Sequence, residues 1–386
     1  MSYPGAPPQQ ARGLVARVRS HLIWRWGVVR KLPARLINDW FGNVWYDRWL
    51  KRKISVTSGQ VSAAPRCAIF VIYPRLGLQL SHLNSLAYLL RKGFSPVVVS
   101  NLPLSPDERT QLTPLCWRLV ERPNYGYDFG AYRDGVLMLL NELSTVSQLL
   151  LVNDSVWFPV PASVDWLSRA EQTPADLVGA VSNDGLVDYL SDPGRGAPWR
   201  YNPSAPRLHY CSFALLVGSR ILNDVGFRRF WQELKLTSDK FLTIRRGEVG
   251  FSRWVIERGY SHTAALEMSR FDQVVEQMGV AQLRELAEHL IIPEDAELRA
   301  EQRKLLEVPD GQSNPSDLRR FILWATAATG PAYALPYWFL QQRSVGFLKK
   351  SPMWLSDATA QITESLVERF GDPAMLEEAR QLRVRR

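Results

Sequence analysis

The stretch LLLVNDSVWFP, residues 149–159, decides how the rest of the chain is interpreted. An apolar run ends abruptly in the polar triplet NDS (153–155), and Trp157 and Phe158 follow at once. A surface turn would explain the polar triplet but not the two aromatic residues. A site at the carboxyl end of a buried strand explains both, because ligands of α/β proteins bind where parallel strands end.

The segments around this stretch alternate between apolar runs and helical patterns. This alternation predicts an α/β fold, with a mostly parallel sheet flanked by helices on both faces. A long Gly/Pro/Asp-rich loop, 182–206, is expected to act as a lid or binding loop. The predicted strands are 67–73, 96–101, 117–122, 148–154, 175–181 and 212–218, and the predicted helices are 80–93, 132–143 and 248–258.

Composition divides the chain into three parts. Residues 1–55 form a basic, Trp-rich arm, and a Ser/Gly/Ala-rich linker runs from Ser55 to Pro65. Residues 66–275 hold the alternating strands and helices, and residues 276–386 are mostly helical. The three cysteines are far apart and form no CxxC pair, which argues against a zinc site or a disulfide framework and favours a reducing compartment.

The positive charge of the chain is concentrated in the arm. The whole chain carries a net charge of +9, and residues 1–53 hold 11 Lys/Arg against two Asp. Ile37, Phe41, Trp45 and Trp49 recur every four residues, so a helix would align them as one stripe. Such a basic, aromatic segment suits an anionic membrane surface, although an arm that packs on the main domain would look the same. Nucleic acid is disfavoured, since no recognised binding motif accompanies the charge.

Residues 321–340 contain no charge and have the length of a membrane span. Gly330, Pro331 and Pro336 interrupt them, however, so we expect a buried helix–turn–helix. No signal peptide is visible, because arginines interrupt each early apolar run. The sequence therefore predicts a cytoplasmic protein that is peripheral on the inner face of the cytoplasmic membrane.

A glycine-rich block, NYGYDFGAYRDG (124–135), precedes the helix that leads into the strand at 148–154. Gly126 and the following glycines permit tight turns before a helix N-terminus, an arrangement that can hold phosphate. Arg133 is a candidate partner of a diphosphate, and Asp128 or Asp134 could bind a sugar hydroxyl. The block matches neither GxGxxG nor the P-loop, so a capped helix start remains the alternative.

Two further carboxylates are candidates for chemistry. Asp154 stands at a strand end, where it could hold Mg²⁺ or Mn²⁺ against a diphosphate, although one carboxylate is a sparse ligand set. Glu248 follows Gly247 in the expected first turn of a helix, where it could act as a general base or merely favour the helix dipole. Asp184 and Asp188 in the long loop are the next carboxylates to consider.

Three blocks of the chain resemble the rhamnan synthesis protein F family of bacterial glycosyltransferases, namely NYGYDFG (124–130), NDSVW (153–157) and HYCSF (209–213). A weaker similarity lies at GFLKKSPM (346–353). The order of the blocks also resembles the wider GT-A inverting glycosyltransferases. The chain departs from that pattern twice, with Asn-Asp-Ser in place of Asp-x-Asp and with Val249 where a second acid is common.

The resemblance implies a GT-A-like domain at 66–275 that binds a nucleotide-sugar donor and no organic cofactor. It implies transfer of L-rhamnose from dTDP-L-rhamnose to a glycan or lipid-linked glycan of the cell surface, such as a lipopolysaccharide O-chain. Glu248 and Asp154 are the expected catalytic residues, with Asp154 as the metal ligand. Donor contacts are expected from Asn124, Gly126, Asp128, Arg133, Asp134, Asn153 and Ser155, and acceptor or lid contacts from His209, Ser212 and Asp184.

Two other classes compete with this interpretation. A catalytically inactive relative that scaffolds a membrane polysaccharide assembly would explain both departures from the acidic pattern. A dinucleotide-dependent oxidoreductase is disfavoured, because no GxGxxG follows the first predicted strand.

Overall fold

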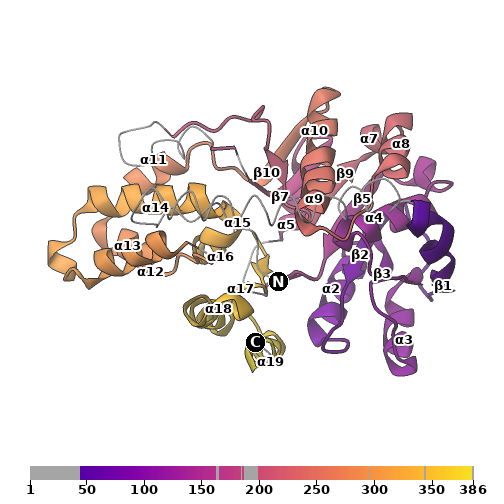
Figure 1. The fold of residues 1–386 in the computed structure, drawn as a ribbon, viewed down its shortest axis with the longest axis horizontal. Helices are drawn as coiled ribbons and strands as arrows, with labels where there is room; N and C mark the ends of the chain where they lie inside the picture. Colours follow the sequence, from indigo (N-terminus) through magenta and orange to yellow (C-terminus); the bar gives the residue numbers. More distant parts are fainter. Residues whose placement is uncertain are drawn as a thin grey trace, which may run out of the picture.

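A computed structural model describes residues 44–161, 165–183, 185–186, 199–293, 295–342 and 345–384. Asp184, Asp188 and the arm before residue 44 lie outside these residues. The predicted α/β architecture is confirmed: a mostly parallel sheet flanked by helices, followed by a mainly helical C-terminal region (Figure 1).

The sheet has nine strands, eight of which follow the order β1-β4-β3-β2-β5-β9-β7-β10, while β8 pairs with β7. The central strands β4, β3, β2 and β5 are mutually parallel, and β9 runs antiparallel to both of its neighbours. Long apolar runs form these central strands because both faces of the sheet are covered. The strands are β1 (Ser55–Ser58), β2 (Arg66–Ile72), β3 (Ser95–Ser100), β4 (Arg118–Glu121), β5 (Gln148–Asn153), β7 (Leu177–Asn183), β8 (His209–Tyr210), β9 (Ala214–Gly218) and β10 (His262–Leu266).

Helices α2 (Leu80–Arg91) and α4 (Tyr127–Met138) cover opposite faces of the sheet. Leu86 and Leu89 of α2 share one buried cluster with Phe70 of β2, whereas Phe129 of α4 shares the other with Ile69. The chain passes from β2 outward to β3 and β4, and then returns to β5 on the other side of β2. The gap between the ends of β2 and β5 is therefore the topological switch point, where ligands of open α/β sheets bind.

The structure corrects the sequence prediction at two places in this half. Residues Ser55–Ser58, expected to belong to a linker, form the edge strand β1, which pairs with β4 although all four side chains are exposed. Helix α4 begins at Tyr127, five residues earlier than predicted, so most of the glycine-rich block is helical. Gly135 lies within α4 and not in a turn. A Cβ there would lie 2.9 Å from Ile69 of β2, so this glycine serves helix–sheet packing.

The remaining helices of this half pack around the sheet and its two main helices. They are the helical turns η1 (Tyr46–Leu50), η2 (Lys51–Lys53), η3 (Thr113–Leu115) and η4 (Leu143–Thr145), the π-helical η5 (Arg245–Val249), and the α-helices α3 (Pro106–Leu112), α5 (Trp166–Gln172), α7 (Ser219–Leu222), α8 (Val225–Glu233), α9 (Lys240–Ile244), α10 (Gly250–Glu257) and α11 (Phe271–Glu276).

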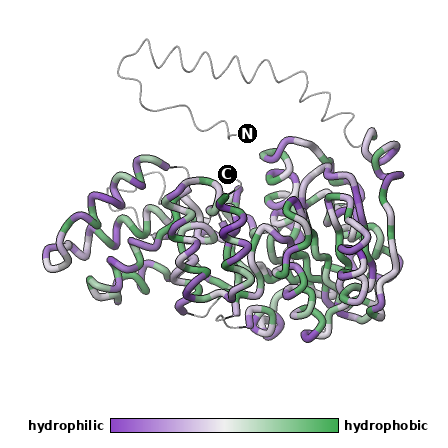
Figure 2. The backbone as a smooth tube through the Cα atoms, turned by 90° about the horizontal axis from the view of Figure 1, so that it is seen from below, coloured by the Kyte–Doolittle hydropathy of each residue, from purple (hydrophilic) through white to green (hydrophobic). Residues whose placement is uncertain are grey.

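The C-terminal region is mainly helical, and its helices alternate hydrophilic and hydrophobic residues, as expected for helices packed on one side (Figure 2). The predicted break within 321–340 is confirmed, because helices end at Thr329 and Ala334. Among the described residues, no helix is long and apolar enough to span a membrane. The elements are α12 (Val280–Glu288), α13 (Ala296–Glu307), η6 (Asp310–Gln312), α14 (Pro315–Thr329), α15 (Pro331–Ala334), α16 (Pro336–Gln341), β11 (Leu348–Lys349), α17 (Pro352–Leu355), α18 (Asp357–Phe370) and α19 (Pro373–Val384).

The aromatic residues after the polar triplet join the two halves of the molecule. Strand β6 (Val156–Trp157) pairs with β11, whose position in the C-terminal region was not predicted. The buried Trp157 indole donates to a carboxylate oxygen of Glu378 on α19 at 3.0 Å. Phe158 stacks on Phe347 with ring centroids 4.3 Å apart. Residues 156–158, which directly follow the polar triplet at the end of β5, thus attach this end of the sheet to the C-terminal region.

Candidate active site

Asn153 organises the turn at the end of β5. Its side-chain Oδ1 accepts from the backbone N–H of Ser155 at 3.1 Å and from the Ser155 hydroxyl at 2.6 Å. Its Nδ2 donates to Oδ2 of Asp128 at 3.1 Å. The buried amide therefore fixes the turn and also orients a carboxylate from α4, so Asn153 and Ser155 shape the site through local hydrogen bonds.

Asp154 lies at the switch point and is held from the β2 side. Its Oδ2 accepts from the backbone N–H of Tyr73 at 2.6 Å and lies 3.2 Å from Nε2 of His82. Nδ1 of His82 accepts from the backbone N–H of Gln79, so in the neutral ring Nε2 carries the proton and donates to Asp154. Burial would raise the pKa of Asp154, but the hydrogen bond from His82, the charge of Lys350 and the hydrogen bond from the Tyr73 backbone hold it below its usual range. Asp154 is therefore ionised at neutral pH.

Asp128 stands in the first turn of α4, next to the turn formed by Asn153. The residue that precedes the helix, Gly126, is its N-cap, and its φ of 81° lies in the left-handed region that favours glycine. Burial, together with the negative charges of Asp154 and Glu248, raises the pKa of Asp128 to about 7. The three carboxylates therefore act on one another electrostatically, although they come from three separate elements. A strongly raised carboxyl pKa is typical of functional sites.

The sequence predicted Glu248 in the first turn of a helix, but the structure places it within a longer helical segment. Helix α9, the π-helical η5 and α10 follow one another without a break in helical backbone, and Glu248 lies in η5. A Cβ on Gly247 would lie 2.3 Å from the Phe129 ring, so this glycine lets η5 approach α4 closely. Oε1 of Glu248 accepts from the backbone N–H of Ser212 at 2.9 Å. Single π-helical turns are frequent at functional sites, and the carboxylate on this one acts electrostatically on Asp128.

His209 and Ser212, expected from the sequence as acceptor or lid residues, lie beside Glu248. Nε2 of His209 is 3.9 Å from Oε2 of Glu248, and its Nδ1 donates to the carbonyl of Arg207 at 2.9 Å. The Ser212 carbonyl accepts from the hydroxyl of Tyr132 on α4 at 2.7 Å. The Ser212 backbone therefore bridges Glu248 and α4. The exposed Asn124 lies in the loop just before Gly126.

Lys349 joins the site from the C-terminal region and was not predicted as a site residue. It belongs to β11 and pairs in register with Val156, two residues after Asp154. Its ammonium lies 4.7 Å from the ring centroid of Phe213 and 5.1 Å from that of Tyr333. Burial lowers the pKa of Lys349, but the nearby Tyr333, Cys211, Glu248 and Asp128 outweigh it and raise that pKa. The sequence signal was the segment GFLKK, but its position in space required the β6–β11 pair.

Arg133 and Asp134 are not brought to this site. The Arg133 guanidinium is buried and binds both carboxylate oxygens of Asp47, at 2.8 and 3.0 Å. Asp134 accepts from Nε of Arg122 at 2.6 Å and from the hydroxyl of Tyr46. Helix α4 starts at Tyr127, so both residues lie within the helix, more than one turn after Asp128, and both are buried. They anchor the end of the N-terminal arm to α4 and are not available to a diphosphate.

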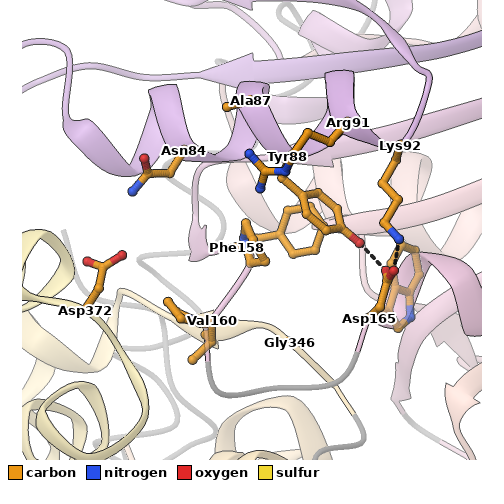
Figure 3. Close-up of a pocket in the computed structure, with 13 residues that line it drawn as sticks. Asn84, Ala87, Tyr88, Arg91, Lys92, Phe158, Val160, Asp165, Gly346 and Asp372 are labelled. Atoms are coloured by element: carbon orange, nitrogen blue, oxygen red, sulfur yellow. Dashed lines mark hydrogen bonds and ion pairs between the residues drawn. The ribbon is translucent and has the colours of Figure 1, made fainter.

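An open pocket of about 480 Å³ lies away from the carboxylate cluster (Figure 3). Asn84, Tyr88 and Arg91 of α2 border one side, and Val160 and Asp372 lie across from them. Both Tyr88 and Lys92 contact Asp165 within it. None of the site carboxylates lines this pocket, and we place the chemistry at the topological switch point because the titratable groups converge there.

A divalent ion would find few protein ligands at the site. No group of three His, Cys, Asp or Glu side chains in the described part of the chain is arranged to hold a metal. One Asp154 oxygen already accepts from Tyr73 and His82. Mg²⁺ is often held by one or two carboxylates together with substrate phosphates, so Asp154 fits as a single ligand of an ion carried by the diphosphate.

The chain belongs to the rhamnan synthesis protein F family, whose sequence profile matches residues 96–291, just over half of the chain. This membership supports a glycosyltransferase. The uncharacterized protein y4gN of Sinorhizobium fredii (strain NBRC 101917 / NGR234) is 30% identical over 218 residues, which cover 55% of this chain and 52% of that relative. The match therefore spans about half the length of the relative.

The solved structures include a mannosyltransferase, PcManGT from Pyrobaculum calidifontis in complex with GDP-Man and Mn²⁺. Its alignment covers 92% of this chain and 88% of its own, at 15% identity and a TM-score of 0.33. This score is too low to support any conclusion about the site.

Proposed function

We propose that the protein is an inverting glycosyltransferase that uses a nucleotide-sugar donor. The observation that carries this proposal is the convergence of Asp128, Asp154 and Glu248 at the topological switch point. Asp128 on α4 and Asp154 after β5 are linked through Asn153, which precedes Asp154 and donates to Asp128. Nucleotides bind at such switch points in open α/β sheets. Family membership supports the same class of reaction.

The proposed reaction is a single displacement. The hydroxyl oxygen of an acceptor sugar forms a bond to the anomeric carbon, and the bond from that carbon to the diphosphate oxygen breaks with inversion. Glu248 takes the hydroxyl proton, since Ser212 holds one of its oxygens in place and the other remains available. Asp128 is the second candidate base, because a pKa of about 7 suits proton transfer at neutral pH. Asp154 borders the diphosphate and would hold a divalent ion bound with it.

We further propose L-rhamnose from dTDP-L-rhamnose as the donor sugar and a cell-surface polysaccharide or lipopolysaccharide O-chain as the acceptor. The support is the description of the family to which the chain belongs. A lipid-linked acceptor would bring the enzyme to the cytoplasmic membrane surface. Trp45 and Trp49 suit such contact, because they are 49% and 59% exposed and precede the basic turn Lys51–Lys53.

Donor binding and the replacement of Asp154 by asparagine test the function together. We expect dTDP, or another nucleoside diphosphate, to raise the melting temperature of the wild type, whereas NAD should not. Asp154→Asn should lower sugar transfer by about 10²–10⁴-fold and weaken donor binding. Asn fits the same space, so the fold should persist; unchanged melting temperature without nucleotide provides the control.

The competing class, an inactive scaffold, gives a different result. Such a protein would bind no nucleoside diphosphate, or would bind one without transfer of sugar to any glycan, and Asp154→Asn would then change nothing that can be measured. Near-normal turnover of Asp154→Asn in an active preparation would show that the site has been wrongly placed.

A further inference from the structure

We propose that Lys349 forms an anion subsite that binds the diphosphate of the nucleotide-sugar donor and stabilises its departure. This inference rests on the proposed function and names a residue outside the stretch matched by the family profile, 96–291. The site would then be incomplete without the C-terminal region, because β11 delivers this cation to the end of β5.

The ammonium groups of Lys349 and Lys350 differ in their partners. Lys350, the next residue, is buried and fully engaged: its ammonium binds Glu378 at 2.7 Å and Ser81 at 3.3 Å. Within the described residues, the Lys349 ammonium forms no hydrogen bond or ion pair, and it instead faces the rings of Phe213 and Tyr333. Two aromatic rings and more distant charges compensate for the water that this partly buried ammonium has lost, and an anionic ligand would add a direct charge-assisted contact.

Two carboxylates of the site are held by other groups of the protein and not by Lys349. Asp154 is held by His82 and by the Tyr73 backbone, and Glu248 is held by the Ser212 backbone. Both are thereby committed to groups of the protein. The carboxylates that act on Lys349 are Glu248 and Asp128, and they do so only as more distant charges. The protein therefore keeps a cation at the site without neutralising it through a direct ion pair. This is the arrangement required to stabilise charge that develops on a leaving group.

A structural role for Lys349 makes a different prediction. If the ammonium only packs between the two aromatic rings, then its replacement should lower the melting temperature and leave ligand affinity unchanged. The donor site should instead show a loss that depends on the phosphate groups of the ligand. The two roles can therefore be separated with ligands that share a base and differ in charge.

The experiment measures binding of dTDP, UDP and GDP, and of the matching nucleosides, by calorimetry with and without EDTA. The variants are Lys349→Met, Lys349→Arg and, as a remote control, Lys304→Met on α13, whose side chain is 76% exposed. Loss of one charge-assisted contact should weaken binding of the preferred diphosphate by about 10- to 100-fold in Lys349→Met, and Lys349→Arg should recover much of it. Nucleoside affinity should change little, and Lys304→Met should match the wild type.

A second comparison uses Lys240→Met, because this exposed lysine of α9 also acts on Asp128. If Lys240→Met weakens diphosphate binding while a folded Lys349→Met does not, the assignment of Lys349 is wrong. Equal loss of nucleoside and diphosphate affinity in Lys349→Met would also overturn it. If the wild type binds none of the nucleotides, the proposed function itself fails, a result that is distinct from an effect confined to Lys349.

Discussion

Two carboxylates on the same helix, Asp128 and Asp134 of α4, meet opposite surroundings. Asp134 is buried against the Arg122 guanidinium, with 2.6 Å between Nε and Oδ2, and it also accepts from the Tyr46 hydroxyl. Asp128 receives one neutral hydrogen bond, from Asn153, and its pKa is raised to about 7 by burial and by two neighbouring carboxylates. The first is neutralised within the fold, whereas the second is left among like charges.

This difference separates a structural carboxylate from a functional one. A buried acid with a cationic partner stabilises packing once the pair has formed, although the pair has little to offer a ligand. An acid held among other acids costs stability, and such a cost is usual where a protein must bind or move protons. The start of α4 beside β5 is therefore where we propose the chemistry, and the part of α4 beyond it holds the N-terminal arm.

The largest change in stability is expected from loss of the buried ion pair between Arg122 and Asp134. Arg122→Met removes the cation and leaves Asp134 buried without its charge partner. We expect the free energy of unfolding to fall by about 3–5 kcal/mol, measured by urea denaturation at pH 7. The double variant Arg122→Met/Asp134→Leu should recover part of this loss, because it removes both charges. A loss below about 1 kcal/mol in the single variant would contradict the assignment of a buried ion pair.

The next effect tests the chemical side. Glu248→Gln keeps an oxygen that can accept from the Ser212 N–H but removes the proton acceptor. Turnover should fall by about 10²–10⁴-fold, with little change in donor affinity or melting temperature. Glu257→Gln is a matched control on α10, where the carboxylate is 61% exposed. If Glu248→Gln keeps full turnover, Asp128 becomes the better candidate for the base.

The sequence supported the fold more fully than the site. Continuous apolar runs predicted the central strands, because a strand buried on both faces has a strong signal. Edge strand β1 gave no such signal, since its side chains are exposed and only its backbone pairs. Arg133 and Asp154 were both candidates for the diphosphate site, but α4 starts five residues earlier than predicted, and the Arg133 side chain is buried in the protein. Lys349 depends on a contact between segments almost 200 residues apart, which no local pattern records.

A smaller effect concerns pH and Asp128. Its pKa is about 7 in the folded protein, against an ordinary value near 3.8, so the folded chain retains a proton that the unfolded chain releases between these values. Stability should therefore fall as pH rises through this window and level off above it. Asp128→Asn lacks this slope and should exceed the wild type by about 1–4 kcal/mol in unfolding free energy at pH 8, but by little at pH 3. Denaturation curves at several pH values measure this, and a variant less stable than the wild type at pH 8 would refute the raised pKa.

The smallest effect concerns the arm, which the structural carboxylate Asp134 helps to hold. Tyr46 is buried while Trp45 and Trp49 remain 49% and 59% exposed, so the anchored turn presents aromatic side chains outward. If this turn meets a lipid surface, Trp49→Ala should lower binding to vesicles that contain anionic lipid by about tenfold, because one aromatic contact is lost. Trp354→Ala on α17 is the matched control, since that tryptophan is 43% exposed at a distant position in the sequence. Binding measured by vesicle sedimentation should also weaken with added salt, because the basic residues of the turn contribute. Equal loss in both variants would point to general surface hydrophobicity, and no loss in either would remove the arm from membrane contact while leaving its attachment to α4 intact.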